Sequence, residues 1–236
     1  MVCVENVSKS FSDGSVALKN VSFSVKDGEF VLIAGSNGSG KTVLMNLIAG
    51  LDYPSAGCIT LDGEAGLVFQ DADCQILGET PYEDVSFGVK NMGFRKEALK
   101  EKTENALKYC GIFHKKDCPA RTMSGGEKRR LAVAGIVAME RNLLIFDEPF
   151  ANLDYPGVQN VCRILKELKE QKKTVIILTH ETEKILALCD RMIVLDKGEM
   201  RFDGTPEEGL LKDLEKWGIR NPLNNKSMKL EDLIWL

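Results

Sequence analysis

The chain has 236 residues, of which 44% are hydrophobic and 28% are charged, an ordinary composition for a soluble globular protein. Its formal net charge of −4 excludes a general attraction to nucleic acid, although a local basic patch remains compatible with it. No apolar run approaches the ~18 residues that a membrane-spanning helix needs, so a partner has to supply any membrane part.

Strand patterns dominate the beginning of the chain. Residues 2–11 alternate between apolar and polar side chains, as a half-buried strand does. Residues 17–25 and 29–35, joined by a turn at 26–28, predict a hairpin that leads into a buried strand. A glycine-rich loop and an apolar helix over residues 43–51 come next, and two further short strands are predicted at 58–63 and 66–70.

Helical patterns replace the strands from about residue 71 to 140, including an exposed amphipathic helix over residues 95–111. Two buried strands of the parallel-sheet type follow, at 143–149 and 174–180, with a helix that begins at Pro156 between them. Residues 191–204 predict a closing hairpin. This order indicates an α/β core with an antiparallel β portion and one helical insert.

A phosphate-binding loop is the strongest motif of the chain. It reads GSNGSGKT, fits G-x-x-x-x-G-K-[ST], and lies between a predicted strand and a predicted helix, as this motif requires. Its backbone N–H groups would cradle phosphates, its lysine would neutralise the β- and γ-phosphates, and its threonine would reach Mg²⁺. The expected nucleotide-binding residues are Gly35, Ser36, Asn37, Gly38, Ser39, Gly40, Lys41 and Thr42.

Polar side chains follow three other predicted strands, where α/β sheets place their ligand chemistry. Asp147 is expected to hold Mg²⁺ through water, and Glu148 to take a proton from the attacking water. Gln70 can ligate Mg²⁺ or orient water, and His180 can bind the γ-phosphate or the water. Each also has a structural interpretation, as a solvated strand end or a structural histidine, and Asp154 has one as a helix N-cap.

The stretch MSGGEKRR predicts a second anion site. Ser124 and Glu127 form the pattern of a capping box at a helix start, yet Gly125 and Gly126 occupy the first turn. Glycine there is best explained by an anion that approaches the bare backbone closely. The basic residues 128–130 that follow are interpreted as a solvated helix face and not as a nucleic-acid site.

Taken in order, these motifs resemble the nucleotide-binding subunit of an ABC (ATP-binding cassette) transporter. The resemblance covers residues 1 to about 210 and implies an ABC-type P-loop ATPase core with a helical subdomain, acting as a Mg²⁺-dependent ATPase. Gln70 then corresponds to the Q-loop glutamine, Asp154 to the D-loop aspartate and His180 to the switch histidine. Phe11 fits the aromatic position that stacks on adenine; its alternative is a core residue of an edge strand.

The resemblance also implies which anion the second site binds. In this family two subunits pack head to tail, and each ATP lies between one phosphate loop and the signature of the other subunit. The signature residues, which would bind the partner's nucleotide in trans, are Ser124, Gly125, Gly126 and Glu127. Met123 stands before them, where leucine is usual. ATP would join the dimer and its hydrolysis would release it.

A narrower resemblance lies in residues 68–93, which look like the ATPases of energy-coupling-factor importers of vitamins and Co²⁺ or Ni²⁺. The implied partners are a second ATPase subunit, a membrane-embedded coupling subunit and a substrate-binding membrane subunit, with no nucleic acid. Asp73, Glu79 and Asp84 are expected to dock the membrane partner, the alternative being a solvated helical face. The protein is expected at the cytoplasmic face of the membrane as a peripheral subunit, and its seven scattered cysteines as reduced thiols.

The expected domains are an ABC ATP-binding domain over 1–210, with its helical subdomain at about 71–140, and a short C-terminal tail over 211–236. The tail could pack on its own domain or on a partner. Three alternative functions stay open: another ABC importer class, a non-transport ABC ATPase of DNA repair or translation, and a nucleotide-binding regulator that does not hydrolyse. The sequence leaves the transported substrate, the identity of the membrane subunits and the choice between homodimer and heterodimer undetermined.

Overall fold

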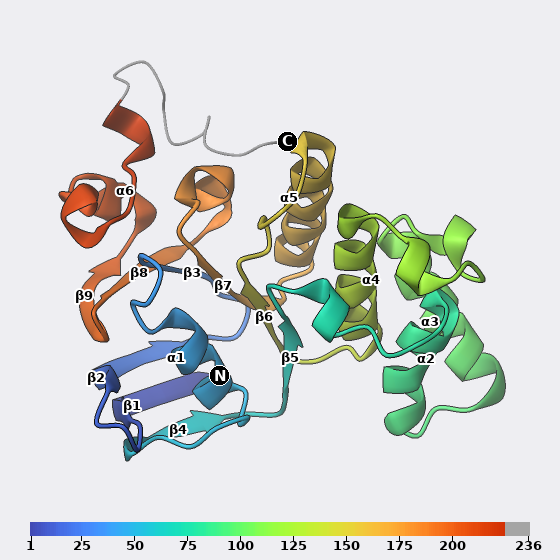
Figure 1. The fold of residues 1–236 in the computed structure, drawn as a ribbon, viewed down its shortest axis with the longest axis horizontal. Coiled ribbons are helices and arrows are strands. Elements are labelled where there is room, and N and C mark those ends of the chain that lie inside the picture. The colour runs from blue at the N-terminus through green and yellow to red at the C-terminus, as the bar shows by residue number, and fades with distance from the viewer. Residues whose placement is uncertain (225–236) are drawn as a thin grey trace.

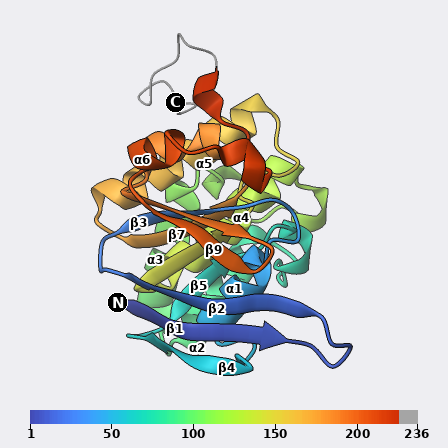
Figure 2. The same cartoon turned by 90° about the vertical axis from the view of Figure 1, so that its left-hand side faces the viewer.

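The computed structural model describes residues 1–224, which fold around two sheets that lie against each other (Figures 1 and 2). The smaller sheet is antiparallel, with strand order β2-β1-β4. Its strands are β1 (Val2–Ser10), β2 (Val16–Val25) and β4 (Ala56–Leu61). It supplies the antiparallel β portion that the sequence predicts.

The larger sheet has the order β5-β6-β7-β3-β8-β9, and all its pairs are parallel except β8 with β9. Its strands are β3 (Phe30–Ala34), β5 (Ala65–Val68), β6 (Leu143–Asp147), β7 (Thr174–Thr179), β8 (Arg191–Asp196) and β9 (Glu199–Gly204). Because the parallel strands share one direction, the loops after β3, β5, β6 and β7 meet at one edge.

The predicted hairpin of residues 17–35 is wrong, whereas the closing hairpin β8–β9 is confirmed. β2 pairs with β1, and the chain crosses to the larger sheet before β3. The burial patterns explain the difference, since β2 alternates while all five residues of β3 are buried. A strand that is buried on both faces belongs in the middle of a parallel sheet.

Two hydrophobic cores flank the larger sheet. One lies between this sheet, α1 and the small sheet, and the other lies beneath α5 and the helical group α2–α4. Consecutive residues of β3, such as Leu32 and Ile33, therefore pack in opposite cores. The helices are α1 (Lys41–Ile48), α2 (Pro81–Asn91), α3 (Lys96–Tyr109), α4 (Gly125–Ala138), α5 (Tyr155–Glu170) and α6 (Pro206–Leu210).

The helical group α2–α4 is the insert that the sequence predicts between two strands of the core, and it projects to one side in Figure 1. Short 3-10 turns connect several elements. They lie at 72–74, 113–115, 120–122, 182–184, 186–188, 214–217 and 222–224. The first of them lies in the connection from β5 to α2, which joins the insert to the sheet.

The described part of the C-terminal tail packs on its own domain. Leu214 and Ile219 are buried in the core beneath α5, and Trp217 and Leu223 pack against that core. The apolar end of the chain, residues 230–236, lies outside the described residues. Within residues 1–224 no helix is long and apolar enough to cross a membrane. The seven cysteines all lie in this part of the chain, and none of them forms a disulfide there.

Candidate functional site

The phosphate loop connects β3 to α1, and its shape depends on a position that only glycine can occupy. Gly40 has a φ of 105°, and a Cβ at this position would lie 2.7 Å from the carbonyl oxygen of Ala17. Glycine therefore provides both the left-handed backbone and the space for the loop to lie against β2. The loop ends where α1 begins, so the helix N-terminus points its N–H groups into it.

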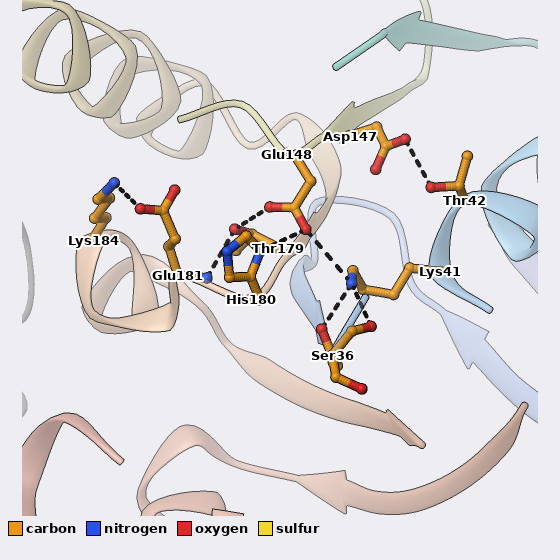
Figure 3. A network of polar contacts seen from close by, with 10 residues as sticks. Ser36, Lys41, Thr42, Asp147, Glu148, Thr179, His180, Glu181 and Lys184 are labelled. Atoms are coloured by element: carbon orange, nitrogen blue, oxygen red, sulfur yellow. Dashed lines mark hydrogen bonds and ion pairs between the residues drawn. The ribbon is translucent and has the colours of Figure 1, made fainter. Parts of the chain in front are cut away.

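Lys41 is held inside the loop. Its side chain is 6% exposed, and its Nζ donates to the carbonyl oxygens of Gly35 at 2.7 Å and Ser36 at 3.2 Å. The same Nζ lies 3.5 Å from Oε1 of Glu148, which follows β6 (Figure 3). A phosphate that binds in the loop would therefore compete with a carboxylate for this ammonium group.

Glu148 is the centre of a buried polar network. Oε2 accepts a hydrogen bond from Thr179 Oγ1 at 2.8 Å, and Oε1 lies 3.0 Å from Nδ1 of His180. The residue is 6% exposed and has a φ of 44°, in the left-handed region that non-glycine residues rarely adopt. Strain and burial of this kind are typical of catalytic positions, because the surrounding structure holds them in place.

Thr42 and Asp147 form the part of the site that fits Mg²⁺. Thr42 Oγ1 donates to Asp147 Oδ2 at 3.1 Å, while Asp147 Oδ1 is buried without a hydrogen-bond partner among the described residues. Burial raises the pKa of the Asp147 carboxyl, and the neighbouring Glu148 raises it further, against the hydrogen bond from Thr42. Protein-bound Mg²⁺ uses one or two carboxylates together with substrate phosphates, so this hydroxyl–carboxylate pair fits the ion.

Gln70 follows β5 at the same edge of the sheet, and its side chain is exposed. Its backbone carbonyl accepts a hydrogen bond from the guanidinium of Arg129, which also donates to the carbonyl of Phe69. Arg129 is 3% exposed. The interpretation of residues 128–130 as a solvated face is therefore wrong for Arg129, which reaches back from α4 to the loop after β5.

The signature begins α4 as predicted. Ser124 and Glu127 form both hydrogen bonds of a capping box, and Glu127 is also paired with Lys115 at 2.5 Å. These contacts lower the pKa of the Glu127 carboxyl, first through Lys115. Nothing lies within 4 Å of a Cβ built on Gly125. The first turn of α4 is thus bare on the side where a ligand would approach, as its two glycines suggest.

Two other predicted residues have clear structural surroundings. Asp154 caps α5, since its Oδ1 accepts from the N–H of Gly157 at 2.9 Å, so its N-cap interpretation is confirmed. Phe11 follows β1 and is 43% exposed, so the alternative of a core residue is wrong. Its ring stays available for stacking, and the Nζ of Lys9 lies 5.6 Å from the ring centre.

The three acids expected at the docking surface differ in their surroundings. Asp84 is half-buried and accepts from the N–H groups of Leu77 and Gly78 at 2.7 and 3.0 Å, so it shapes its own loop. Asp73 is paired with Lys128 at 2.5 Å.

Glu79 lines a cavity of about 350 Å³ together with Thr80, Pro119 and Arg121. Leu77 is 73% exposed beside it.

Sequence reasoning missed two residues of the site. Thr179, the last residue of β7, donates to Glu148, and its own Oγ1 accepts from the N–H of Glu181 at 3.1 Å. Its position directly before His180, at a strand end, is the signal that could have found it. Arg129 has no such signal, because a basic residue in a basic run on a helix is usually solvated.

Comparisons with known proteins agree with this geometry. The ABC transporter family profile matches residues 18–151. The chain is 37% identical to an energy-coupling factor transporter ATP-binding protein, EcfA1, of Fusobacterium nucleatum, over 100% of this chain and 98% of that protein. It is 38% identical to EcfA3 of Clostridium perfringens, over 87% of this chain and 78% of that protein.

Solved structures are similar as well. The structure of cbiO1 from Clostridium perfringens, described as part of the ABC transporter complex cbiONQ, superposes with a TM-score of 0.81 at 36% identity. It covers 95% of this chain and 94% of its own. A dimeric ATP-binding cassette, MJ0796, bound to ADP and Pi has a TM-score of 0.78 at 28% identity, covering 87% of this chain and 99% of its own.

Proposed function

Because the chain belongs to the ABC transporter family of ATP-binding proteins, we propose that it is the motor subunit of an energy-coupling-factor importer, with vitamins or Co²⁺ or Ni²⁺ ions as cargo. As a member of this family it binds and hydrolyses ATP. The observation that carries the proposal is the set of side chains around Glu148. Lys41, Thr179 and His180 converge on one buried carboxylate beside the phosphate loop.

The chemistry assigned to these residues is phosphoryl transfer to water. When ATP binds, Lys41 gives up its contact with Glu148 and holds the β- and γ-phosphates. Glu148 then accepts a proton from the attacking water. Thr179 keeps the carboxylate in place, and His180 orients the water or the γ-phosphate. Mg²⁺, held by Thr42, Gln70 and by Asp147 through water, would neutralise charge that develops on the phosphate oxygens.

The nucleotide site is completed by a second subunit. The bare first turn of α4 supports binding of the partner's γ-phosphate by Ser124 and by the N–H groups of Gly125 and Gly126, with Glu127 as the cap that fixes them. Residues 151–153, which precede Asp154 and form the D-loop with it, lie beside this turn, because they line a cleft of about 290 Å³ together with Gly125. ATP that bridges two such surfaces would hold a homodimer, or a heterodimer with a related ATPase.

The partners and location are part of the same proposal. The domain over 1–210, with its helical subdomain at about 71–140, would sit as a peripheral subunit on the cytoplasmic face of the membrane, beneath a coupling subunit and a substrate-binding subunit. The cavity at Glu79 with exposed Leu77 beside it supports docking of a membrane subunit there. Asp73, which lines the cleft of about 290 Å³ and pairs with Lys128, is proposed to contact the same membrane subunit. Asp84 would act by holding the loop that carries Leu77.

Mixing two inactive variants tests the shared site. A Ser124→Arg chain and a Lys41→Ala chain each lack one half of every site, but their heterodimer contains one intact site. ATPase activity should therefore return on mixing, while labelled ATP should bind the Ser124→Arg chain nearly as well as the wild type. Loss of ATP binding by Ser124→Arg would mean that the signature serves its own nucleotide, and no return of activity would contradict the shared site.

A further inference from the structure

Arg129 is a buried cation that the catalytic assignment does not use. It lies in the second turn of α4, just after the signature, and α4 runs beside β5 (Figure 1). Its Nη1 donates to the carbonyl oxygen of Phe69 and its Nη2 to that of Gln70. The two ends of one guanidinium therefore bind two consecutive carbonyl groups directly after β5.

A neighbouring ion pair ties the same two segments together. Lys128, the residue before Arg129, is paired with Asp73 at 2.5 Å, and the lysine side chain is 17% exposed. Residues 69–73 are thus held to α4 by two successive side chains of that helix. Residues 70–73, the start of α4 and residues 151–153 of the D-loop all line the cleft of about 290 Å³, so this contact lies directly beside the signature.

The burial of Arg129 is costly for a residue that only fills space. Burial lowers the pKa of its guanidinium, and Asp71 and Asp147 oppose this as nearby negative charges. An apolar side chain of similar volume often stabilises a fold as well as a buried ionic group does. What an apolar side chain lacks is the planar fork, which fixes two acceptors at once in a defined geometry.

We propose that Arg129 is a positioning residue that fixes the signature relative to Gln70. Nucleotide bound in the chain's own site then determines the position of the signature, which in turn binds the partner's nucleotide. The proposal rests on the proposed function, because it needs Gln70 near the chain's own Mg·ATP and Ser124 at the partner's. Movement of Gln70 toward the γ-phosphate pulls its own carbonyl, and through Arg129 it shifts the start of α4.

The informative substitution is Arg129→Lys, because lysine keeps the charge and much of the stem but has no fork to span two carbonyls. The matched control is Arg130→Lys, the same change at the next residue of α4, for which the structure gives no hydrogen bond to residues 69–73. A misplacement of about 1 Å can cost about a hundredfold in rate. We therefore expect kcat to fall about ten- to a hundredfold in Arg129→Lys and less than twofold in the control.

Two readouts separate positioning from mere stability. Binding of a labelled, non-hydrolysable ATP analogue with Mg²⁺ should keep its Kd within about twofold in Arg129→Lys, because Lys41 and the phosphate loop are untouched. In the wild-type chain, kept monomeric as checked by size-exclusion chromatography, the analogue should change amide hydrogen exchange both at residues 35–42 and at residues 124–128. In Arg129→Lys the change at 35–42 should remain and the change at 124–128 should disappear.

Three outcomes overturn the inference. The first is an unaltered kcat per folded Arg129→Lys chain, and the second is an exchange response at 124–128 that persists in this variant. The third needs no variant: a wild-type chain that binds the analogue without any response at 124–128 overturns the inference and leaves the proposed function standing. A wild-type chain that binds no ATP overturns both.

Discussion

Replacing Glu148 by glutamine separates two roles of its carboxylate, which is a proton acceptor and also the counter-charge of Lys41. Glutamine keeps the shape and can still accept from Thr179, but it carries no charge. Loss of a general base typically costs 10²- to 10⁴-fold in rate, so hydrolysis should fall by about that factor. ATP should then persist in the site and hold an ATP-dependent dimer.

The second effect follows from the 3.5 Å separation of Lys41 Nζ and Glu148 Oε1. Removing one member of a buried ion pair costs roughly 3–5 kcal/mol, and the two carbonyl groups that Lys41 keeps reduce this to about 1–3 kcal/mol. In a chain of this length that lowers the Tm by roughly 3–9 °C. A triphosphate gives Lys41 a new counter-charge, so ATP should raise the Tm of the variant more than that of the wild type.

The assay combines a coupled ATPase measurement, size-exclusion chromatography with saturating ATP, and thermal unfolding with and without ATP. Glu181→Gln is the matched control, because Glu181 pairs with Lys184 and not with Lys41. Hydrolysis within threefold of the wild type would refute the role of Glu148 as the base. A gain in Tm on adding ATP no larger than that of the wild type would refute the competition between carboxylate and phosphate for Lys41.

Three further changes test other parts of the site. Asp147→Asn should abolish Mg²⁺-dependent hydrolysis. Because the pKa of Asp147 is raised in the folded chain, the stability of the wild type without nucleotide should fall relative to that of the variant as the pH rises from the usual aspartate range to the raised pKa. Curves of Tm against pH that stay parallel for the two proteins would contradict this. Glu83, in the first turn of α2, accepts from the N–H of Glu79 at 3.2 Å, so Glu79→Lys with Glu83→Lys should break pull-down of the membrane subunit and leave soluble ATPase activity about unchanged. Glu97→Lys on α3 is the control, and retained pull-down would be the contrary result. Phe11→Ala should weaken ATP binding about tenfold by loss of stacking, whereas Phe11→Tyr should bind ATP as the wild type does. An ATP affinity of Phe11→Ala equal to that of the wild type would show that Phe11 is not part of the site.

The sequence predicts most of this fold because its strongest patterns are local. Buried runs such as residues 143–149 have no polar face, so they fit only the middle of a parallel sheet, and the glycines of the phosphate loop allow few backbone conformations. The pairing of β2 is where prediction failed. A turn at 26–28 reads like a hairpin, and only the full burial of β3 shows that the two strands belong to different sheets.

The site divides in the same way. Lys41, Thr42 and the acids after β6 lie in motifs whose chemistry dictates their spacing, so their convergence could be predicted. Arg129 could not, because its burial depends on where the insert packs against β5, which no local pattern encodes. Asp84 is similar: its charge suggested a partner, whereas its carboxylate binds the N–H groups of its own loop.

Isolation of the tagged full-length chain from native membranes in mild detergent, with identification of everything that remains bound, tests most directly whether the chain drives an importer. We expect a second ATPase subunit, a membrane-embedded coupling subunit and a substrate-binding membrane subunit in comparable amounts, and release of none of them by nuclease. Recovery of the chain only from the soluble fraction, or together with nucleic-acid or ribosomal components in place of membrane subunits, would contradict the proposed function.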